Sequence, residues 1–398
     1  MDERLESIKD ADARYVMQTY RRLPVAFVRG RGTRLWDTAG REYLDLVGGL
    51  GVVVLGHCHP GVTAAIRSQA ETLIHTTNLY YVEPQAELAR MLVENSFPGR
   101  CFFCNSGAEA NEGALKLARK HHYKRGAPRA KIVCALGSFH GRTIATLSAT
   151  GQPQKWAPFA PTLEGFVHVS LNDVDALRSA VDENTAAVVL EPIQGEGGVH
   201  PADQVFLQAA REECDRAGAL LVLDEVQTGL GRTGRLFAYE HYGVEPDVMT
   251  VAKGLANGVP AAAFIAAGEL GDVLEPGDHG TTFGGGFLAC AAALETLKVI
   301  LKDRLCDNAV RVGALLKERM QAMEDRVPLV VEVRGRGLML AVELAGERAR
   351  EVVSGCLERG VIVNDVTPTA IRILPPLVLD EEEAMRGMDV LEEVLTGL

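Results

Sequence analysis

The chain has 398 residues, of which 47% are hydrophobic and 24% charged, a balance typical of a folded globular protein rather than a disordered one. At this length we expect two associated lobes around a sizeable core. The 53 acidic and 41 basic residues give a formal net charge of -12, so there is no broad basic field to attract nucleic acid or an anionic membrane. By elimination, the composition favours small-molecule chemistry.

The segment from Met1 to Gly30 mixes charged and apolar side chains without a continuous hydrophobic core, which argues against a secretory signal. No later segment reaches about 18 uncharged apolar residues, the length needed to span a membrane. We therefore expect a cytoplasmic protein with neither a membrane nor a nucleic acid as partner. Its 8 cysteines are expected to be free thiols in a reducing compartment.

The predicted elements begin with a hairpin at Gly32 to Leu46 and continue as short apolar strands that alternate with helices. The strands and helices expected in this middle part are Arg100 to Cys104, Glu109 to Tyr123, Lys131 to Ala135, Ala186 to Leu190, Phe206 to Ala217, Leu220 to Leu223 and Val248 to Ala252. Fully apolar short strands separated by helices indicate a mostly parallel sheet covered on both faces. The sequence thus predicts an α/β protein.

Beyond about Ala289 the pattern changes to longer helices followed by isolated strands. The expected elements are helices at Cys290 to Leu301 and Asn308 to Met323 and strands at Leu329 to Arg334, Leu338 to Leu344 and Ile371 to Leu374. We expect residues 290–398 to form a small α+β domain, with residues 1–50 packed against it and residues 51–289 forming the large domain.

Cys101 and Cys104 form a C-x-x-C motif, and Cys58 lies between His57 and His59, so a metal site has to be considered. The C-x-x-C motif falls within a predicted strand, where residues i and i+3 point to opposite faces of the sheet. We therefore expect no metal site.

Two predicted strands end in residues suited to catalysis. The strand Ala219 to Leu223 is followed by Asp224, and the strand Val248 to Ala252 is followed by Lys253. Because ligands bind beyond the carboxyl ends of parallel strands, the two side chains are candidates to meet in one crevice. Pyridoxal phosphate needs such a pair, a lysine to hold it as an imine and a carboxylate to keep its ring nitrogen protonated. Taken alone, the two residues are more typical of a solvated surface.

A candidate phosphate site is Asn105 to Glu112, which leads from a predicted strand into a helix. Free backbone amides and the helix dipole at such a helix start favour a phosphate. Ser106 with Glu109 also fits a capping box, so a simple capped helix is the competing interpretation. A second turn at Ser138 to Thr143 offers the ring of Phe139 beside a cation, although an isolated phenylalanine more often belongs to the core.

Together these residues resemble the class III aminotransferases, which are pyridoxal-phosphate enzymes of fold type I, the aspartate-aminotransferase fold, and within that class the acetylornithine aminotransferases. The matching motifs are G-H-C-H-P at Gly56 to Pro60, N-S-G-A-E-A-N-E at Asn105 to Glu112, S-F-H-G-R-T at Ser138 to Thr143, E-P-I-Q-G-E-G-G-V at Glu191 to Val199, L-D-E-V-Q-T-G-L-G-R-T-G at Leu223 to Gly234, P-D-V-M-T-V-A-K-G-L at Pro246 to Leu255, H-G-T-T-F-G-G at His279 to Gly285 and I-R-I-L-P-P-L at Ile371 to Leu377. The match runs from about Tyr20 to the C-terminus, and the motifs follow the family order.

The resemblance implies that Lys253 carries pyridoxal 5'-phosphate as a Schiff base, with Asp224 beside the ring nitrogen and Gln227 beside the phenolic oxygen. The cofactor-binding residues that it implies are Ser106, Gly107, Ala108, Phe139, Asp224, Val226, Gln227, Lys253 and Thr282. Thr282 would reach the phosphate bound by the neighbouring subunit. A homodimer with shared active sites follows from that role.

The resemblance also implies a set of substrate-binding residues. Arg372 would bind the α-carboxylate of glutamate or 2-oxoglutarate, and Arg142 a carboxylate at the far end of the substrate, since a planar guanidinium holds a carboxylate through paired hydrogen bonds. Glu196 would pair with Arg372 when the donor presents a terminal amino group instead, and so act as a switch. Tyr20 matches a tyrosine near the substrate entrance. The implied catalytic residues are Lys253, Asp224 and Glu196.

The activity implied is transfer of the terminal amino group of N2-acetylornithine to 2-oxoglutarate, which gives N-acetylglutamate 5-semialdehyde and glutamate in arginine biosynthesis. Other class III omega-aminotransferase substrates stay open: ornithine, succinylornithine, 4-aminobutyrate and a carrier-bound aminoadipate semialdehyde. Two other functions also stay open. One is a 2,1-aminomutase, against which Arg372 and Glu196 argue, and the other is a non-catalytic protein of the same fold. Ornithine aminotransferases carry a tyrosine near the position where this sequence has Leu50, and the absence of that tyrosine argues mildly against free ornithine as donor. In a second departure from the family pattern, Gly286-Phe287 stands where many relatives have Asn-Pro.

Overall fold

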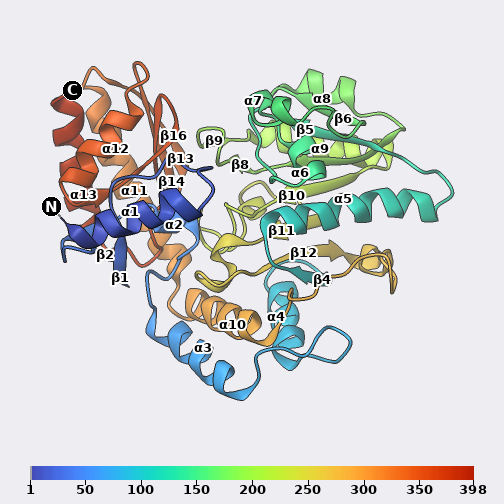
Figure 1. Ribbon diagram of the computed structural model, residues 1–398. Helices are drawn as coiled ribbons and strands as arrows, with labels where there is room; N and C mark the ends of the chain where they lie inside the picture. The colour runs from blue at the N-terminus through green and yellow to red at the C-terminus, as the bar shows by residue number, and fades with distance from the viewer. Residues whose placement is uncertain (1) are drawn as a thin grey trace.

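The computed structural model describes residues 2–398, and a seven-stranded sheet forms the centre of the larger lobe (Figure 1). The strand order is β4-β12-β11-β10-β7-β5-β6. These strands are β4 (Gly99–Cys104), β5 (Lys131–Ala135), β6 (Phe166–Val169), β7 (Thr185–Leu190), β10 (Leu220–Asp224), β11 (Val248–Val251) and β12 (Ala262–Ala267). The predicted strands of the middle part are therefore confirmed to within one or two residues.

The sheet is mostly parallel, as predicted. β10 runs parallel to β7 and β11, and β5 runs parallel to β6 and β7, whereas β12 is antiparallel to both β11 and β4. β6 and β12 were not predicted from the sequence, and β12 is the strand that departs from the parallel arrangement. Its direction follows from the short connection after β11, since a parallel return needs a crossover of about a dozen residues or more.

Alternate side chains of β10 point to opposite faces of the sheet and enter two separate cores. Leu221 and Leu223 belong to the larger core together with residues of α9 (Gln204–Ala217), such as Phe206. Val222 belongs to a second core with residues of α5 (Gly107–Lys124). Helices thus cover both faces, which explains why every residue of β7 and β10 is buried and why these strands are apolar apart from Thr185 and Asp224 at their ends.

The two ends of the chain lie in the other lobe, near α12 and α13 (Figure 1). β1 (Phe27–Arg31), β2 (Arg34–Asp37) and β3 (Glu42–Asp45) are joined by β15 (Val361–Ile362) in one sheet. β2 and β3 pair antiparallel, which confirms the predicted hairpin. The second sheet, of order β13-β14-β17-β16, consists of β13 (Val330–Arg336), β14 (Met339–Leu344), β17 (Ala370–Ile373) and β16 (Asn364–Thr367). Segments from the two chain ends therefore share one sheet.

The remaining helices cover these sheets or connect them. α10 (Phe287–Lys302) packs against α3 (Pro60–Thr72) and α4 (Glu83–Glu94), and also contacts α11 (Leu305–Glu324). The other elements are α1 (Glu3–Tyr15), α2 (Gly48–Gly51), α6 (Ile144–Ala149), α7 (Pro153–Trp156), α8 (Val174–Ala180), α12 (Ala349–Glu358), α13 (Glu381–Thr396), the short strands β8 (Ile193–Gln194) and β9 (His200–Pro201), and the 3-10 helices η1 (Ala157–Phe159), η2 (Ala238–His241), η3 (Lys253–Ala256) and η4 (Gly268–Asp272). Within residues 2–398, no helix has both the length and the apolar character required to cross a bilayer.

Candidate active site

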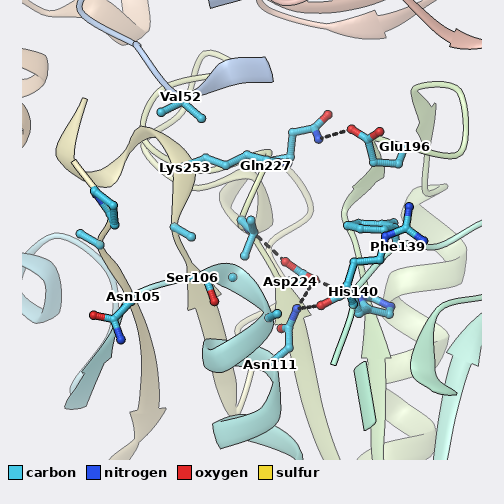
Figure 2. A pocket seen from close by; sticks show the side chains of 18 of the residues that line it. Val52, Asn105, Ser106, Asn111, Phe139, His140, Glu196, Asp224, Gln227 and Lys253 are labelled. Atoms are coloured by element: carbon cyan, nitrogen blue, oxygen red, sulfur yellow. Dashed lines mark hydrogen bonds and ion pairs between the residues drawn. The ribbon is translucent and has the colours of Figure 1, made fainter. Parts of the chain in front are cut away.

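Asp224 and Lys253 lie at the carboxyl ends of two neighbouring parallel strands. Asp224 is the last residue of β10, and Lys253 begins η3 directly after β11. In the sheet, Asp224 is paired with Thr250 of β11, so the two strand ends are side by side. Both side chains line a cavity of about 450 Å³ (Figure 2), a volume suited to a small ligand.

The amine of Lys253 projects into this cavity and makes no ion pair with any residue between 2 and 398. Burial lowers the pKa of Lys253, and the nearby carboxylate of Glu196 partly opposes that effect. A lysine whose ammonium form is disfavoured is a better nucleophile and proton acceptor at neutral pH. The unpaired amine in a cavity of this size fits a residue that binds an aldehyde cofactor covalently.

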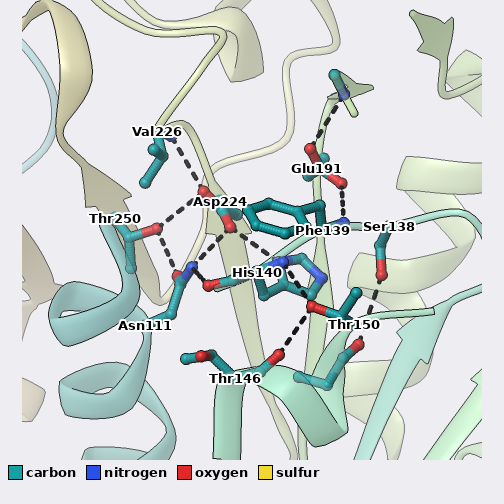
Figure 3. Close-up of polar contacts among 12 residues, drawn as sticks. Asn111, Ser138, Phe139, His140, Thr146, Thr150, Glu191, Asp224, Val226 and Thr250 are labelled. Carbon is teal, nitrogen blue, oxygen red and sulfur yellow. Dashed lines mark hydrogen bonds and ion pairs between the residues drawn. The ribbon is translucent and has the colours of Figure 1, made fainter. Parts of the chain in front are cut away.

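Four side-chain and backbone donors surround the carboxylate of Asp224 (Figure 3). Asn111 Nδ2 donates to Asp224 Oδ2 at 2.7 Å, and His140 Nδ1 lies 2.8 Å from the same oxygen. The backbone amide of Val226 donates to Oδ1 at 3.1 Å, and Thr250 Oγ1 lies 3.3 Å from it. The carboxylate is therefore held in one orientation beside the cavity.

The network around Asp224 is buried and links three separate chain segments. The pKa of His140 is raised overall: burial opposes the charged ring, but its hydrogen bond to Asp224 and the charge of that carboxylate outweigh burial. Thr250 Oγ1 also lies 2.8 Å from Asn111 Oδ1, which fixes the amide so that its nitrogen faces Asp224. Asn111, His140 and Thr250 were not predicted as site residues. All three lie within quoted motifs, which was the available signal.

The start of α5 forms part of the cavity wall. Ser106 caps the helix: its hydroxyl accepts from the amide of Glu109 at 3.3 Å, and Glu109 Oε2 accepts from the amide of Ser106 at 3.1 Å. Gly107 and Ala108, in the first turn, line the cavity. A Cβ on Gly107 would lie 2.8 Å from a methyl group of Val226, so only glycine permits this close approach. The capping box and the anion site are therefore compatible interpretations of one helix start.

Glu191 connects the two loops that border the cavity. Its Oε2 accepts from the amide of Phe139 at 2.9 Å, and its Oε1 accepts from the amide of Gly195 at 3.1 Å, next to Glu196. Burial raises the pKa of Glu191 to about 7, although the charge of His140 works against that rise. Sequence reasoning missed this residue, because its role depends on two amides that are distant from each other along the chain.

Arg372 and Glu196 form an ion pair at the edge of the cavity. Arg372 Nη1 donates to Glu196 Oε1 at 2.6 Å and to Gln227 Oε1 at 3.0 Å. The guanidinium is 1% exposed and Glu196 is 26% exposed. Burial alone would raise the pKa of Glu196, but the charges of Arg372 and Lys253 lower it to about 2. The pair is therefore fully charged at neutral pH.

The structure brings most of the predicted site residues to this one cavity. Its lining includes Ser106, Gly107, Ala108, Phe139, Arg142, Glu196, Asp224, Val226, Gln227 and Lys253. Arg372 joins the site through Glu196 and Gln227. Tyr20 is 76% exposed, and Thr282 lines a separate small cavity with Thr76 and Asn78. The roles expected of Tyr20 and Thr282 stay predictions.

Comparisons with known proteins agree with this geometry. Residues 15–395 match the family model for aminotransferase class-III. The chain is 50% identical over 388 residues to an acetylornithine aminotransferase of Caldanaerobacter subterraneus subsp. tengcongensis, covering 97% of this chain and 98% of that protein. It is 47% identical over 390 residues to one of Methanocaldococcus jannaschii, covering 98% of each.

Among solved structures, the ornithine aminotransferase of Toxoplasma gondii ME49 superposes with a TM-score of 0.95 at 38% identity, covering 99% of this chain and 95% of that one. The acetylornithine aminotransferase of Elizabethkingia anophelis gives a TM-score of 0.91 at 32% identity, covering 99% of both chains. Family match, identity and superposition all extend over nearly the whole chain. The chain therefore belongs to the class III aminotransferases, a family of pyridoxal-phosphate-dependent enzymes.

Proposed function

We propose that this aminotransferase transfers the terminal amino group of N2-acetylornithine to 2-oxoglutarate, forming N-acetylglutamate 5-semialdehyde and glutamate. The observation that carries the proposal is the ion pair between Arg372 and Glu196 beside the amine of Lys253. At the position of this ion pair, the acceptor needs a positive charge to bind its α-carboxylate, whereas the donor with its terminal amino group needs that positive charge to be neutralised. The relatives named acetylornithine aminotransferase, at 44–50% identity, support the choice of donor.

Pyridoxal phosphate fits the residues of the cavity. Lys253 would hold it covalently, Asp224 would face its ring nitrogen, and the amides at the start of α5 would bind its phosphate. Phe139 and Val226 would contact the two faces of its ring. When bound, the cofactor supplies an electron sink that stabilises negative charge on the substrate carbon bearing the amine. Lys253, with its lowered pKa, is the group suited to remove and return the proton on that carbon.

Glu196 has two partners, which suits it to the role of a switch. In the structure, its Oε1 accepts from Arg372 and also from Gln227 Nε2, at 3.2 Å. With the terminal-amine donor, the pair with Arg372 neutralises the guanidinium and spares the donor ammonium a repulsive contact. With glutamate or 2-oxoglutarate, Arg372 binds the α-carboxylate instead, while Gln227 continues to hold Glu196.

At the far end of the cavity, Arg142 is exposed and lines the wall next to Phe139. It would bind the carboxylate at the distal end of either substrate. A guanidinium that is not already paired with a carboxylate retains its full capacity for a bidentate contact.

The same proposal includes a homodimeric assembly and the division of the chain into two domains. A homodimer would bring Thr282 of one subunit to the phosphate site of the other. Within residues 2–398 of one chain, Thr282 lines a small cavity separate from that of Lys253, which is consistent with this arrangement. Tyr20, exposed in the single chain, would lie near the substrate entrance. We further propose a cytoplasmic enzyme with a large domain at 51–289 and a small domain at 290–398, against which residues 1–50 pack.

Ornithine is the second candidate donor, favoured by the TM-score of 0.95 with an ornithine aminotransferase. A panel of donors tests the proposal: kcat/KM is measured with N2-acetylornithine, ornithine, succinylornithine and 4-aminobutyrate, each with 2-oxoglutarate as acceptor. We expect N2-acetylornithine to give the highest value. A higher value with another donor overturns the assignment, and product formation without 2-oxoglutarate would favour an aminomutase.

A further inference from the structure

Apart from the amine of Lys253, most charged groups around the cavity have partners, but two further cations do not. Arg372 is paired with Glu196, and Asp224 with His140. The other carboxylate of the cavity wall, Glu191, accepts backbone amides on both oxygens. Arg142 and Lys155, by contrast, form no ion pair with any residue in the described range 2–398. The site therefore has an excess of positive charge at the end where these two cations lie.

Lys155 lies in α7 and is half-buried. Its Nζ is 4.7 Å from the centroid of the Phe139 ring, and Arg142 Cζ is 5.2 Å from the same centroid. Two cations from different segments thus lie against the Phe139 ring, which lines the cavity. Cation–π attraction to Phe139 helps to keep both there despite their mutual repulsion.

The charges of the substrate site reach the amine of Lys155. Burial is the main cause that lowers the pKa of Lys155; Glu196 then raises it, and Arg142 lowers it again. Glu196 and Arg142 are the groups expected to meet the two ends of the substrate. Lys155 therefore contributes to the electrostatic potential within the cavity although it is not part of the wall.

We propose that Lys155 determines donor specificity: with Arg142 it makes the distal end of the site doubly cationic, so that a carboxylate is accepted there only when no ammonium group adjoins it. This inference rests on the proposed function. Ornithine and N2-acetylornithine share the same chain and the same carboxylate, and differ because acylation removes the positive charge of the α-amino group. Lys155 would repel the α-ammonium of ornithine and leave the neutral amide of the acylated donor unaffected.

The test compares Lys155→Gln and Lys155→Arg with the parent holoenzyme, and Lys302→Gln, an exposed lysine at the end of α10, is the matched control. The quantity measured is the ratio of kcat/KM for N2-acetylornithine to that for ornithine, in which the shared attraction for the carboxylate cancels. For Lys155→Gln we expect this ratio to fall about tenfold, the order of one partly screened charge–charge interaction, mainly through a lower KM for ornithine. Lys155→Arg and Lys302→Gln should keep the ratio within about twofold.

An unchanged ratio in Lys155→Gln, or an equal fall in Lys155→Arg, overturns the role of Lys155. So does weaker binding of pyridoxal phosphate with an unchanged ratio, which would make Lys155 a partner of the phosphate. A parent enzyme that does not turn over N2-acetylornithine overturns the proposed function and this inference together, and is recognised before any variant is compared. Far-UV circular dichroism of each variant establishes that the fold is retained.

Discussion

Arg372 Nη1 and Glu196 Oε1 lie 2.6 Å apart, so one ion pair connects β17 of the smaller sheet with the loop between β8 and β9. The guanidinium is also fixed by Asn364 Oδ1, which accepts from its Nη2 at 2.7 Å. Arg372 is almost fully buried, and a buried charge without a partner is strongly unfavourable. When Glu196 leaves Arg372, the guanidinium therefore needs another anionic partner, and a substrate carboxylate can provide it.

Glu196→Gln should impair the two half-reactions unequally. With the negative charge removed, Arg372 repels the terminal ammonium of the donor, so we expect that half-reaction to slow about 10- to 100-fold, while the glutamate half-reaction changes by less than about fivefold. Single-turnover measurements of each half-reaction, followed by absorbance of the bound cofactor, test this.

The control for that variant is Glu332→Gln, which removes a carboxylate from a different arginine pair, with Arg334 on β13. It should leave both half-reactions unchanged. Equal slowing of the two half-reactions in Glu196→Gln would contradict the switch.

Lys253→Ala should keep the fold and abolish turnover. Because we propose that Lys253 both holds the cofactor covalently and transfers the proton, its removal should reduce kcat by at least about 10³-fold. The visible absorption of the lysine-bound cofactor should disappear, while far-UV circular dichroism stays unchanged. Lys302→Ala, at an exposed site, serves as control. Retention of the visible band in Lys253→Ala would show that another lysine binds the cofactor.

Asp224→Asn should weaken cofactor binding although it preserves shape. Asn111 Nδ2 and the backbone amide of Val226 both donate to Asp224, and an amide at position 224 offers only one accepting atom to them. We expect the Kd for pyridoxal phosphate to rise about 10- to 100-fold and kcat to fall by about 10³-fold. Fluorescence titration of the apoenzyme measures the first effect.

A matched control for Asp224→Asn is Asp247→Asn. Asp247 directly precedes β11, at the opposite end of the sheet, and its substitution removes an ion pair with Arg211. This variant should be less stable but should bind the cofactor with unchanged Kd. If both variants bind it equally well, Asp224 does not contact the cofactor.

Glu225→Gln should make stability less dependent on pH. Glu225 is fully buried, and burial raises its pKa from 4.5 to about 7, although its hydrogen bonds from Thr228 and Tyr239 oppose the rise. A carboxyl group whose pKa is raised on folding contributes stability below pH 4.5, and that contribution is lost as the pH rises through about 7. Glutamine is neutral at every pH and retains the ability to accept from the amide of Tyr239.

Thermal unfolding of the two proteins between pH 5.5 and pH 8.5 tests this. The Tm of the parent enzyme should fall with rising pH by about 2–4 °C more than that of Glu225→Gln. Glu245→Gln, an exposed neighbour, should follow the parent. Parallel curves for the parent and Glu225→Gln would mean that Glu225 is charged in the folded protein across this range.

The sequence alone determined those features that depend on neighbours in the chain. The strands were predicted because both faces of this sheet are covered, so that a run such as Leu220 to Leu223, directly before Asp224, is apolar at every position. The capping box at Ser106 was visible because its two partners are three residues apart. The motif containing Lys253 placed it after a strand for the same local reason.

Only the tertiary structure decided which distant residues meet. Asn111 reaches Asp224 across 113 positions, a separation at which no periodicity in the sequence specifies a partner. The pair of Arg372 and Glu196, 176 positions apart, was expected only through the family resemblance. Lys155 gave no signal in the sequence, because nothing distinguishes a lysine two residues after a proline in a short helix until the structure shows its amine 4.7 Å from the centroid of the Phe139 ring. The physical reason is the same in each case: hydrophobic burial is recorded residue by residue in the sequence, whereas a hydrogen bond or an ion pair depends on where the packed sheet brings two segments together.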